Sequence, residues 1–353
     1  MKKTGIGFIE RGNNRKSVLS FLFGFCGFWV VYAGLESGIL DFIKNYGHSI
    51  RESEILKSGK YNSKFLSIWL KAAYAFGIIE RNQRCEFWVS DTVKQELFNG
   101  ENSSLLSDKI KMYARFGKLY ESFSKGSRIN NSFAGNNFKQ SFSLISAMAE
   151  VTRNDYYGIF QAAKGSRAGL DGLLQGKRTR LLDIGTGFGY NLLSIADKYP
   201  NSHIMGIDID PRAVAFCVKR INSFNLQHRI IAKVMDARKI SFTNNFDIIL
   251  MNLSLHEIDS DLNNIVKFLK KCKSALRKSG YLIISELISP ESFSSYRSNV
   301  GKSLASMEIL EFVLGYNIFS LKEVKNLLAS AGFKVISIAK QADPLKKLII
   351  SRK

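Results

Sequence analysis

Cysteine is scarce in this sequence, and its four residues form no recognisable pattern. Cys26, Cys85, Cys217 and Cys272 lie far apart, with no C-x-x-C pair and no histidine pair near them. No zinc or other metal site is therefore predicted. We expect reduced, mostly buried thiols in a cytoplasmic protein.

Acidic residues are few compared with basic ones. The 353 residues include 51 Lys and Arg against 30 Asp and Glu, which gives a formal charge of +21. Such an excess raises nucleic acid and anionic membranes as partners. The basic residues are spread thinly along the chain, so general surface charge is favoured over a dedicated nucleic-acid face.

Only one long uncharged apolar run is present, Val18–Leu35, and basic residues precede it between positions 2 and 16. Its length is borderline for a membrane span, and the basic flank is also typical of a signal peptide. However, three glycines interrupt the run, which continues without a break into Glu36–Ile43. We therefore expect a buried packing helix leading into an amphipathic one, without membrane contact.

A glycine-rich turn between a strand and a helix is the most informative feature. Leu181–Ile184 is a short apolar run typical of a buried strand, and Tyr190–Ala196 has helical spacing. Gly185, Gly187 and Gly189 lie between them, where the backbone has to turn tightly and approach a ligand closely. This order predicts a nucleotide-type cofactor site.

The type of cofactor is indicated by the turn and by the next two predicted strands. No Lys-Ser/Thr pair comes after Gly189, which excludes a P-loop. The G-x-G-x-G spacing disfavours the main competitor, a dehydrogenase with G-x-G-x-x-G. The next predicted strand ends at Asp208, whose carboxylate can accept two hydrogen bonds from a ribose diol. The strand Arg229–Met235 then leads to Asp236, which suits an adenine amino group.

This ordered series resembles the class I S-adenosylmethionine-dependent methyltransferases from about Lys177 to the C-terminus. Its landmarks are Asp183–Gly189, Gly206–Pro211, Asp236 and Phe246–Asn252. The resemblance implies S-adenosyl-L-methionine as the cofactor. It implies cofactor contacts from Asp183, Gly185, Thr186, Gly187, Gly189, Asp208, Ile209, Asp236, Ala237 and Asn252.

The predicted fold class is α/β, because strands and helices alternate regularly in this half. The last two predicted strands, Lys334–Ile338 and Lys347–Ser351, are separated only by a turn and must be antiparallel. The resemblance implies a Rossmann-like sheet of seven strands with an antiparallel last strand. A mostly helical, winged-helix-like domain precedes it.

The N-terminal domain is predicted from two helices, Ser53–Lys57 and Ser63–Phe76, a hairpin within Ile78–Val89, and a helix capped by Ser90-Asp91. Ser63–Phe76 is apolar nearly all round and lacks the basic and amide side chains of a DNA-recognition helix. A dimer interface would bury such a helix on more than one side. Dimer packing is therefore favoured over DNA recognition.

The segment between the two domains is rich in aromatic residues. We divide the chain into a winged-helix-like dimerisation domain (1–100), a helical linker or substrate-lining region (101–172) and a cofactor-binding domain (173–353). The aromatics either wall a substrate cavity or form core. They are Tyr113, Phe116, Tyr120, Phe123, Phe133, Phe138, Phe142, Tyr156, Tyr157 and Phe160.

Only one of the four histidines, His256, follows the carboxyl end of a predicted strand, and Glu286 closes the next strand. Ligands bind at that edge of an open α/β sheet. A histidine oriented by a carboxylate can act as a general base near neutral pH, which a phenol with its pKa of about 10 requires. The alternative is that His256 only packs against the helix from Asp259.

With the N-terminal half included, the resemblance narrows to the winged-helix-dimerised small-molecule O-methyltransferases. The further landmarks are Gly38–Ile43, Gly77–Glu80, Leu255–Ile258, Phe319–Val324 and Ser330–Phe333. The resemblance implies a homodimer and a small-molecule methyl acceptor. It also implies that His256 is the base and that Glu286 orients it.

Two positions depart from this family. Ile318 lies at or near the place of a second supporting glutamate, and an apolar side chain cannot hold an imidazole. Ile258 replaces a common tryptophan. These departures favour a weaker base, or N- or C-methylation of a metabolite without a base.

Three rival functions are considered. A nucleic-acid methyltransferase is favoured by the charge, but Asn252–Leu255 lacks the Asn/Asp-Pro-Pro-aromatic sequence of enzymes that methylate base amino groups. Ribose or carbon targets in RNA remain open. A sensor of S-adenosylmethionine without turnover is the non-enzyme alternative. A metal-dependent catechol enzyme would need a clustered Asp-Asp-Asn set, which we do not find.

Overall fold

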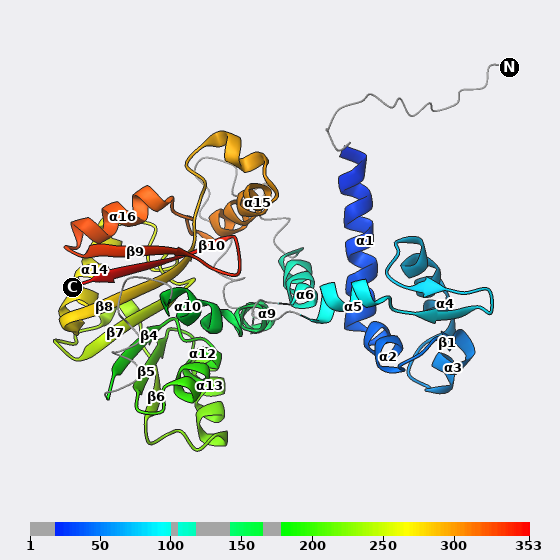
Figure 1. The fold of residues 1–353 in the computed structure, drawn as a ribbon, viewed down its shortest axis with the longest axis horizontal. Coiled ribbons are helices and arrows are strands. Elements are labelled where there is room, and N and C mark those ends of the chain that lie inside the picture. Colours follow the sequence, from blue (N-terminus) through cyan, green and yellow to red (C-terminus); the bar gives the residue numbers. More distant parts are fainter. Residues whose placement is uncertain (1–17, 100–104, 118–141, 165–177) are drawn as a thin grey trace. The chain divides into compact units, whose positions relative to one another are not determined.

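The computed structural model describes residues 18–99, 105–117, 142–164 and 178–353 (Figure 1). Two compact units are present, residues 1–98 and residues 99–353. The predicted roles of residues 1–100 in dimerisation and of 101–172 in lining a substrate site stay predictions.

The first unit consists of short helices around a three-stranded sheet with the strand order β1-β3-β2. Strands β2 and β3 form the predicted hairpin, in which Arg81 pairs with Phe87. The Asn62 side chain accepts a hydrogen bond from the Phe65 N–H and begins helix α4. The elements are α1 (Val18–Glu36), α2 (Ile39–Asn45), β1 (Ile50–Arg51), α3 (Glu52–Lys57), α4 (Ser63–Ala75), β2 (Glu80–Arg81), β3 (Glu86–Trp88) and α5 (Asp91–Phe98).

Helix α1 is buried only in its second half, so the prediction of a buried packing helix is wrong for the first half. Trp69 of α4 lies against Gly34, and its indole Nε1 donates to the carbonyl of Val30 at 2.9 Å. Near the other end of α1, Phe21 is 65% exposed and Phe23 is 57% exposed, because no described part of this unit covers them.

Helix α4 also has two different faces in the single chain. Its buried side consists of Leu66, Trp69, Leu70 and Ala73. Phe65, Ile68 and Tyr74 lie exposed on other sides of the helix. The prediction of burial on more than one side is therefore not met within one chain.

Among the described helices, no single one is long and apolar enough to cross a membrane. Ser20–Glu36 and Ile39–Asn45 reach the required length and composition only as a pair, and the pair is bent by 69°.

The second unit is built on the predicted seven-stranded sheet, with the order β6-β5-β4-β7-β8-β10-β9. Strands β6, β5, β4, β7 and β8 are parallel, and β10 pairs antiparallel with both β8 and β9. This confirms the predicted fold class and the antiparallel last strand. The strands are β4 (Arg180–Ile184), β5 (His203–Asp208), β6 (Ile230–Val234), β7 (Phe246–Asn252), β8 (Leu276–Leu287), β9 (Lys334–Lys340) and β10 (Lys346–Arg352).

Helices cover both faces of this sheet and bury its apolar strands (Figure 1). One core contains Phe268 of α14 and Leu328 of α16, and the opposite core contains Ile195 of α12, Cys217 of α13 and Phe160 of α10. The helices of this unit are α6 (Leu106–Phe116), α9 (Phe142–Thr152), α10 (Asp155–Lys164), α12 (Tyr190–Lys198), α13 (Pro211–Ser223), η2 (Ala237–Lys239), α14 (Leu262–Ala275), η3 (Phe293–Arg297), α15 (Asn299–Leu314) and α16 (Leu321–Ser330).

Several aromatic residues considered for a cavity wall are core residues instead. Phe116 of α6 packs in a core with residues of α9 and α15. Tyr156 and Phe160 belong to one of the two cores of the large sheet. Phe142 stacks with Phe188 and Phe216. Tyr120, Phe123, Phe133 and Phe138 lie outside the described residues.

The cysteines are free, as predicted, but only half of them are buried. Cys217 and Cys272 lie in the two cores of the large sheet, whereas Cys26 and Cys85 are exposed. The prediction of mostly buried thiols is wrong for the first unit, because Cys26 is on the uncovered helix α1 and Cys85 is in the hairpin turn.

Candidate active site

The glycine turn after β4 needs glycine for both conformation and space. Gly185 and Gly189 each have a φ of 77°, a left-handed conformation that side chains disfavour. A Cβ on Gly185 would lie 2.8 Å from the Cβ of Ser254. A Cβ on Gly189 would lie 2.3 Å from the sulfur of Cys217. The turn therefore packs tightly against the loop after β7 and against helix α13.

Asp208, at the carboxyl end of β5, joins that strand to the glycine turn. Its Oδ2 accepts a hydrogen bond from the Gly187 N–H at 2.8 Å, and its Oδ1 accepts from the Asp210 N–H at 2.9 Å. Burial raises the pKa of Asp208, and these backbone donors oppose the rise. Each carboxylate oxygen can accept a further hydrogen bond, so Asp208 keeps the capacity to hold a diol.

A cavity of about 390 Å³ opens beside this turn. Its volume is in the range of small-molecule sites. The ends of β4 and β5 border it together with η2 and the segment after β7. Five of the predicted cofactor residues line it: Gly185, Asp208, Ile209, Asp236 and Ala237.

Asp236 lines the cavity but is engaged by Arg238. Its carboxylate accepts from the backbone N–H of Arg238 and from the guanidinium, at 2.9 Å in each case. These bonds hold the pKa of Asp236 below its usual range. Arg238 also lies 3.6 Å from Asp259. The charge of Asp236 is thus balanced within the cavity wall.

Asp183 lies behind the glycine turn, fully buried. Its Oδ1 accepts a hydrogen bond from the Tyr156 hydroxyl of α10 at 2.7 Å. Burial raises the pKa of Asp183 to about 6, although the hydrogen bond from Tyr156 and the nearby Thr186 hydroxyl oppose the rise. Asp183 therefore supports the turn from the core and does not line the cavity.

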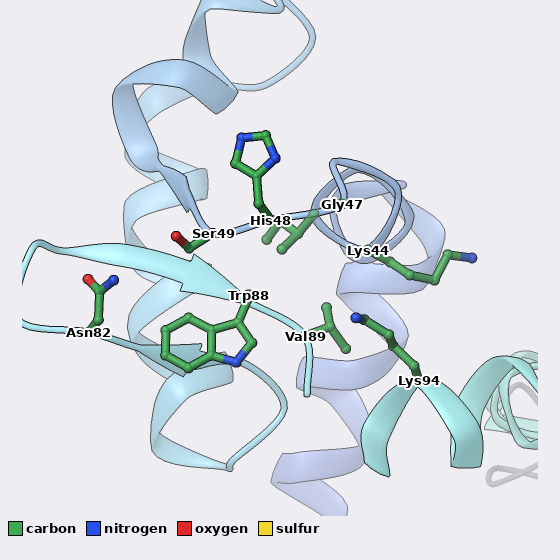
Figure 2. A pocket seen from close by; sticks show the side chains of 9 residues that line it. Lys44, Gly47, His48, Ser49, Asn82, Trp88, Val89 and Lys94 are labelled. Carbon is green, nitrogen blue, oxygen red and sulfur yellow. The ribbon is translucent and has the colours of Figure 1, made fainter. Parts of the chain in front are cut away.

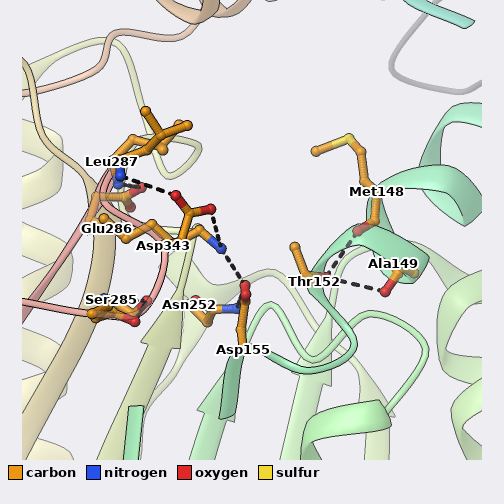
Figure 3. Close-up of polar contacts among 12 residues, drawn as sticks. Met148, Ala149, Thr152, Asp155, Asn252, Ser285, Glu286, Leu287 and Asp343 are labelled. Carbon is orange, nitrogen blue, oxygen red and sulfur yellow. Dashed lines mark hydrogen bonds and ion pairs between the residues drawn. The ribbon is translucent and has the colours of Figure 1, made fainter. Parts of the chain in front are cut away.

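Asn252, at the end of β7, belongs to a buried polar cluster (Figure 3). Its Nδ2 donates to Oδ2 of Asp155 at 3.1 Å, and Nζ of Lys346 donates to the same oxygen at 2.6 Å. The Oδ1 of Asn252 is buried without a hydrogen-bond partner in the described part of the chain. Asn252 is thus held toward α10, and it does not line the cavity.

His256 and Glu286 form the predicted pair. Nδ1 of His256 lies 2.9 Å from Oε1 of Glu286, and both side chains are buried. Glu286 is held by the backbone N–H groups of Leu255 and Leu287, which donate to its two oxygens. The ring is therefore fixed, and its Nε2 is left for other contacts.

The loop between β7 and His256 has a left-handed residue. Leu253 has a φ of 53°, and its N–H donates to the carbonyl of Ser285 at 2.9 Å. The hydroxyl of the next residue, Ser254, donates to the carbonyl of Ile184 at 2.9 Å. Such strain persists where neighbouring contacts fix the backbone, as they do here just before His256.

Two carboxylates that the sequence analysis missed face Nε2 of His256. Oε2 of Glu311 in α15 lies 3.7 Å away, and Oε1 of Glu257 lies 4.0 Å away. The inference from Ile318 that the imidazole lacks a second carboxylate is wrong, because Glu311 supplies it from another helix. Tyr316 follows the turn at Gly315. Its ring lies edge-on to the imidazole, with the two ring centroids 6.0 Å apart.

These charges decide the protonation of His256. Burial disfavours the imidazolium, but Glu286 and Glu311 outweigh it and hold the pKa of His256 well above its ordinary value. Partial desolvation raises the pKa of Glu257 to about 7, and Glu311 and Glu286 add to the rise. No metal-binding group of three or more ligands occurs within residues 18–99, 105–117, 142–164 and 178–353.

A second cavity, of about 350 Å³, lies within the first unit (Figure 2). His48, Trp88 and two lysines are among its lining residues. Lys44 is 2.8 Å from Asp41, and Lys94 is 3.0 Å from Asp91. The charges of both lysines are therefore partly neutralised, and none of the predicted site residues lies there.

Comparison with protein families matches residues 175–332 to a methyltransferase domain. Myricetin 3-O-methyltransferase 3 of Solanum habrochaites is 27% identical over 162 residues, which are 46% of this chain and 42% of that protein. Anthranilate N-methyltransferase of Ruta graveolens is 29% identical over 167 residues, which are 46% of this chain and 41% of that protein. The chain thus spans less than half the length of these relatives.

Among solved structures, that of the mitomycin 7-O-methyltransferase MmcR has a TM-score of 0.71. The similarity covers 95% of this chain and 97% of that one, at 14% sequence identity. At this identity the comparison shows a shared fold, and it extends over both units of the chain.

Proposed function

We propose that this chain, whose residues 175–332 match a methyltransferase domain, methylates a hydroxyl group of a small molecule. The donor is S-adenosyl-L-methionine. The observation that carries the proposal is the position of His256, whose neighbour Glu257 lines the same cavity as Asp208. A base beside a cofactor cavity is what methylation of a weakly acidic hydroxyl requires.

The residues of the cavity fit this donor. Gly185 leaves bare backbone where a Cβ would collide with Ser254, and Asp208 has acceptor capacity for a ribose diol. Ile209 and Ala237 offer apolar surface to an adenine ring at the same cavity. When bound, the donor supplies an electrophilic methyl group on a sulfonium.

His256 has the role of the base in this proposal. Glu286 at Nδ1 fixes the ring, so Nε2 is the atom that receives the hydroxyl proton. The acceptor oxygen then forms the new bond to the methyl carbon as the carbon–sulfur bond breaks. Because the imidazole has a raised pKa, only the fraction that is neutral can take the proton.

Incorporation of a labelled methyl group tests the function. The protein is incubated with methyl-labelled S-adenosylmethionine and a cell extract separated into metabolites, RNA and protein. We expect label in metabolites, and far less with His256→Ala at unchanged donor affinity. Label in RNA would favour the nucleic-acid alternative. Tight donor binding without any labelled product would favour a sensor.

We also propose a homodimer formed by the first unit. The apolar residues Phe21, Leu22 and Phe23 of α1 and Phe65, Ile68 and Tyr74 of α4 are all exposed in one chain. Apolar surface of this extent is typical of a protein–protein interface. A second copy would also bury the outer sides of α4, as its all-round apolar sequence predicts.

A further inference from the structure

The surroundings of His256, which reach the cavity wall at Glu257, are acidic, although the protein carries a formal charge of +21. Three carboxylates surround the imidazole: Glu286 at Nδ1, and Glu311 and Glu257 toward Nε2. The imidazolium supplies one positive charge, which Glu286 and Glu311 share. A cationic ligand would supply a second, and this reasoning rests on the proposed function, because it assumes that the acceptor approaches Nε2.

Glu311 is the more informative of the two. Its side chain is only 3% exposed, and its Oε2 has no hydrogen-bond partner in the described part of the chain. The 3.7 Å to the imidazole is too long for a hydrogen bond. A buried carboxylate oxygen without a hydrogen-bond donor is costly, so a donor on a bound ligand would stabilise it.

Glu257 belongs both to the wall of the cavity and to the surroundings of His256. It lines the cavity, its side chain is 37% exposed there, and it lies 4.0 Å from the same imidazole nitrogen. The basic side chain lining this cavity, Arg238, is engaged by Asp236 and Asp259. A ligand group at this place therefore meets acceptor oxygens with negative charge.

We propose that the methyl acceptor carries a positively charged amino group beside the hydroxyl that is methylated, and that Glu311 and Glu257 bind this amino group. An ammonium has three donors, which suits two carboxylates around one position. Hydroxyl and amino group lie close together in the acceptor, because the oxygens that receive the amino protons are within 4.0 Å of the nitrogen that receives the hydroxyl proton. An acidic substituent there would be repelled.

Three probes with the same phenol ring test this charge preference. They are 2-hydroxybenzylamine, 2-hydroxybenzyl alcohol and 2-hydroxybenzoate, whose substituents are positive, neutral and negative. Binding is measured by calorimetry on the full-length protein saturated with S-adenosylhomocysteine. We expect the amine to bind on the order of tenfold more tightly than the alcohol, as a charge-assisted hydrogen bond provides, and the acid to bind most weakly.

Variants assign the preference to the two carboxylates. Glu257→Gln and Glu311→Gln should each reduce the ratio of amine to alcohol affinity severalfold, whereas Glu291→Gln, at an exposed position, should leave it unchanged. Unchanged affinity for S-adenosylhomocysteine shows that each variant is folded.

The outcomes separate this inference from the proposed function. If S-adenosylhomocysteine does not bind, the proposed function fails. If it binds and the alcohol or the acid equals the amine, or the amine shows no binding at its solubility limit, the inference about the acceptor is overturned. The same holds if both glutamine variants keep the full preference.

Discussion

Glu311 places its Oε2 3.7 Å from Nε2 of His256, while Glu286 contacts Nδ1 of the same ring at 2.9 Å. The imidazole therefore lies between two buried carboxylates from different elements, α15 and β8. Both favour the charged ring and hold its pKa well above the ordinary value. This arrangement has a direct consequence for the pH dependence of a reaction that uses His256 as a base.

The first prediction concerns Glu311→Gln. In the parent, kcat/KM should rise with pH through the raised pKa of His256, because only the neutral ring accepts a proton. Removing the charge of Glu311 lowers this pKa, so the acidic limb of the profile should move to lower pH. Glu311→Asp keeps the charge, so its acidic limb should stay close to that of the parent. A profile that is merely lower at every pH would assign Glu311 a structural role only.

The second prediction concerns Asp208→Ala. Loss of the carboxylate removes the expected acceptor for the ribose diol and releases the Gly187 N–H. We expect affinity for S-adenosylmethionine to fall on the order of a hundredfold, measured by calorimetry. Asp210→Ala is the matched control, because Asp210 caps α13 two residues later and does not line the cavity. Equal losses in both variants would contradict a direct contact at Asp208.

The cofactor half of the site could be predicted from the sequence because its signals are local. Gly185, Gly187 and Gly189 follow a strand directly, and Asp208 ends the next one, so their positions follow from strand and turn patterns alone. The strands and helices around them, and the antiparallel last strand of the sheet, are found as predicted.

The second carboxylate at His256 could not be predicted in the same way. Glu311 lies in a helix that is apolar around it, with Leu310 and Val313 buried in the core of α6, α9 and α15. Its contact with His256 exists only after α15 packs beside the loop that follows β7. The one signal was an acid within such an apolar helix, which is unusual unless the acid has a partner. The outer half of α1 was mispredicted for a related reason, since burial depends on what covers a helix.

The third prediction concerns the stability of the second unit and Asp183. Its pKa is raised from 3.8 to about 6 by burial, so its contribution to stability is present at acidic pH and is lost as pH rises through about 6. The loss amounts to about 3 kcal/mol. Asp183→Asn does not titrate there. Its free energy of unfolding relative to the parent should therefore improve between pH 4 and pH 7.

Denaturant unfolding without cofactor measures this difference at both pH values. Tyr156→Phe is a useful companion, because the Tyr156 hydroxyl lowers the pKa of Asp183. Removal of this hydroxyl should raise the pKa of Asp183, so the stability contribution of Asp183 should be lost at a higher pH than in the parent. A difference between Asp183→Asn and the parent that does not change with pH would show that Asp183 does not titrate in this range.

The fourth prediction concerns the apolar surface of α1 and α4. Ile68→Glu places a charge on the exposed side of α4, where Ile68 is 57% exposed, without touching the buried side at Trp69 and Leu70. If a second copy covers this side, sedimentation velocity should show a dimer in the parent and a monomer in the variant. Phe224→Glu, at a 63% exposed position in the second unit, is the control and should stay dimeric.

Cysteine labelling gives an independent measure of the same interface. Cys26 lies on α1 within the exposed apolar stretch, and Cys85 lies in the hairpin turn. In the dimer, we expect Cys26 to react more slowly with a thiol reagent than Cys85. In Ile68→Glu the two rates should approach each other, because dissociation uncovers α1. A parent that is monomeric at micromolar concentration, with Cys26 as reactive as in the variant, would rule out this interface.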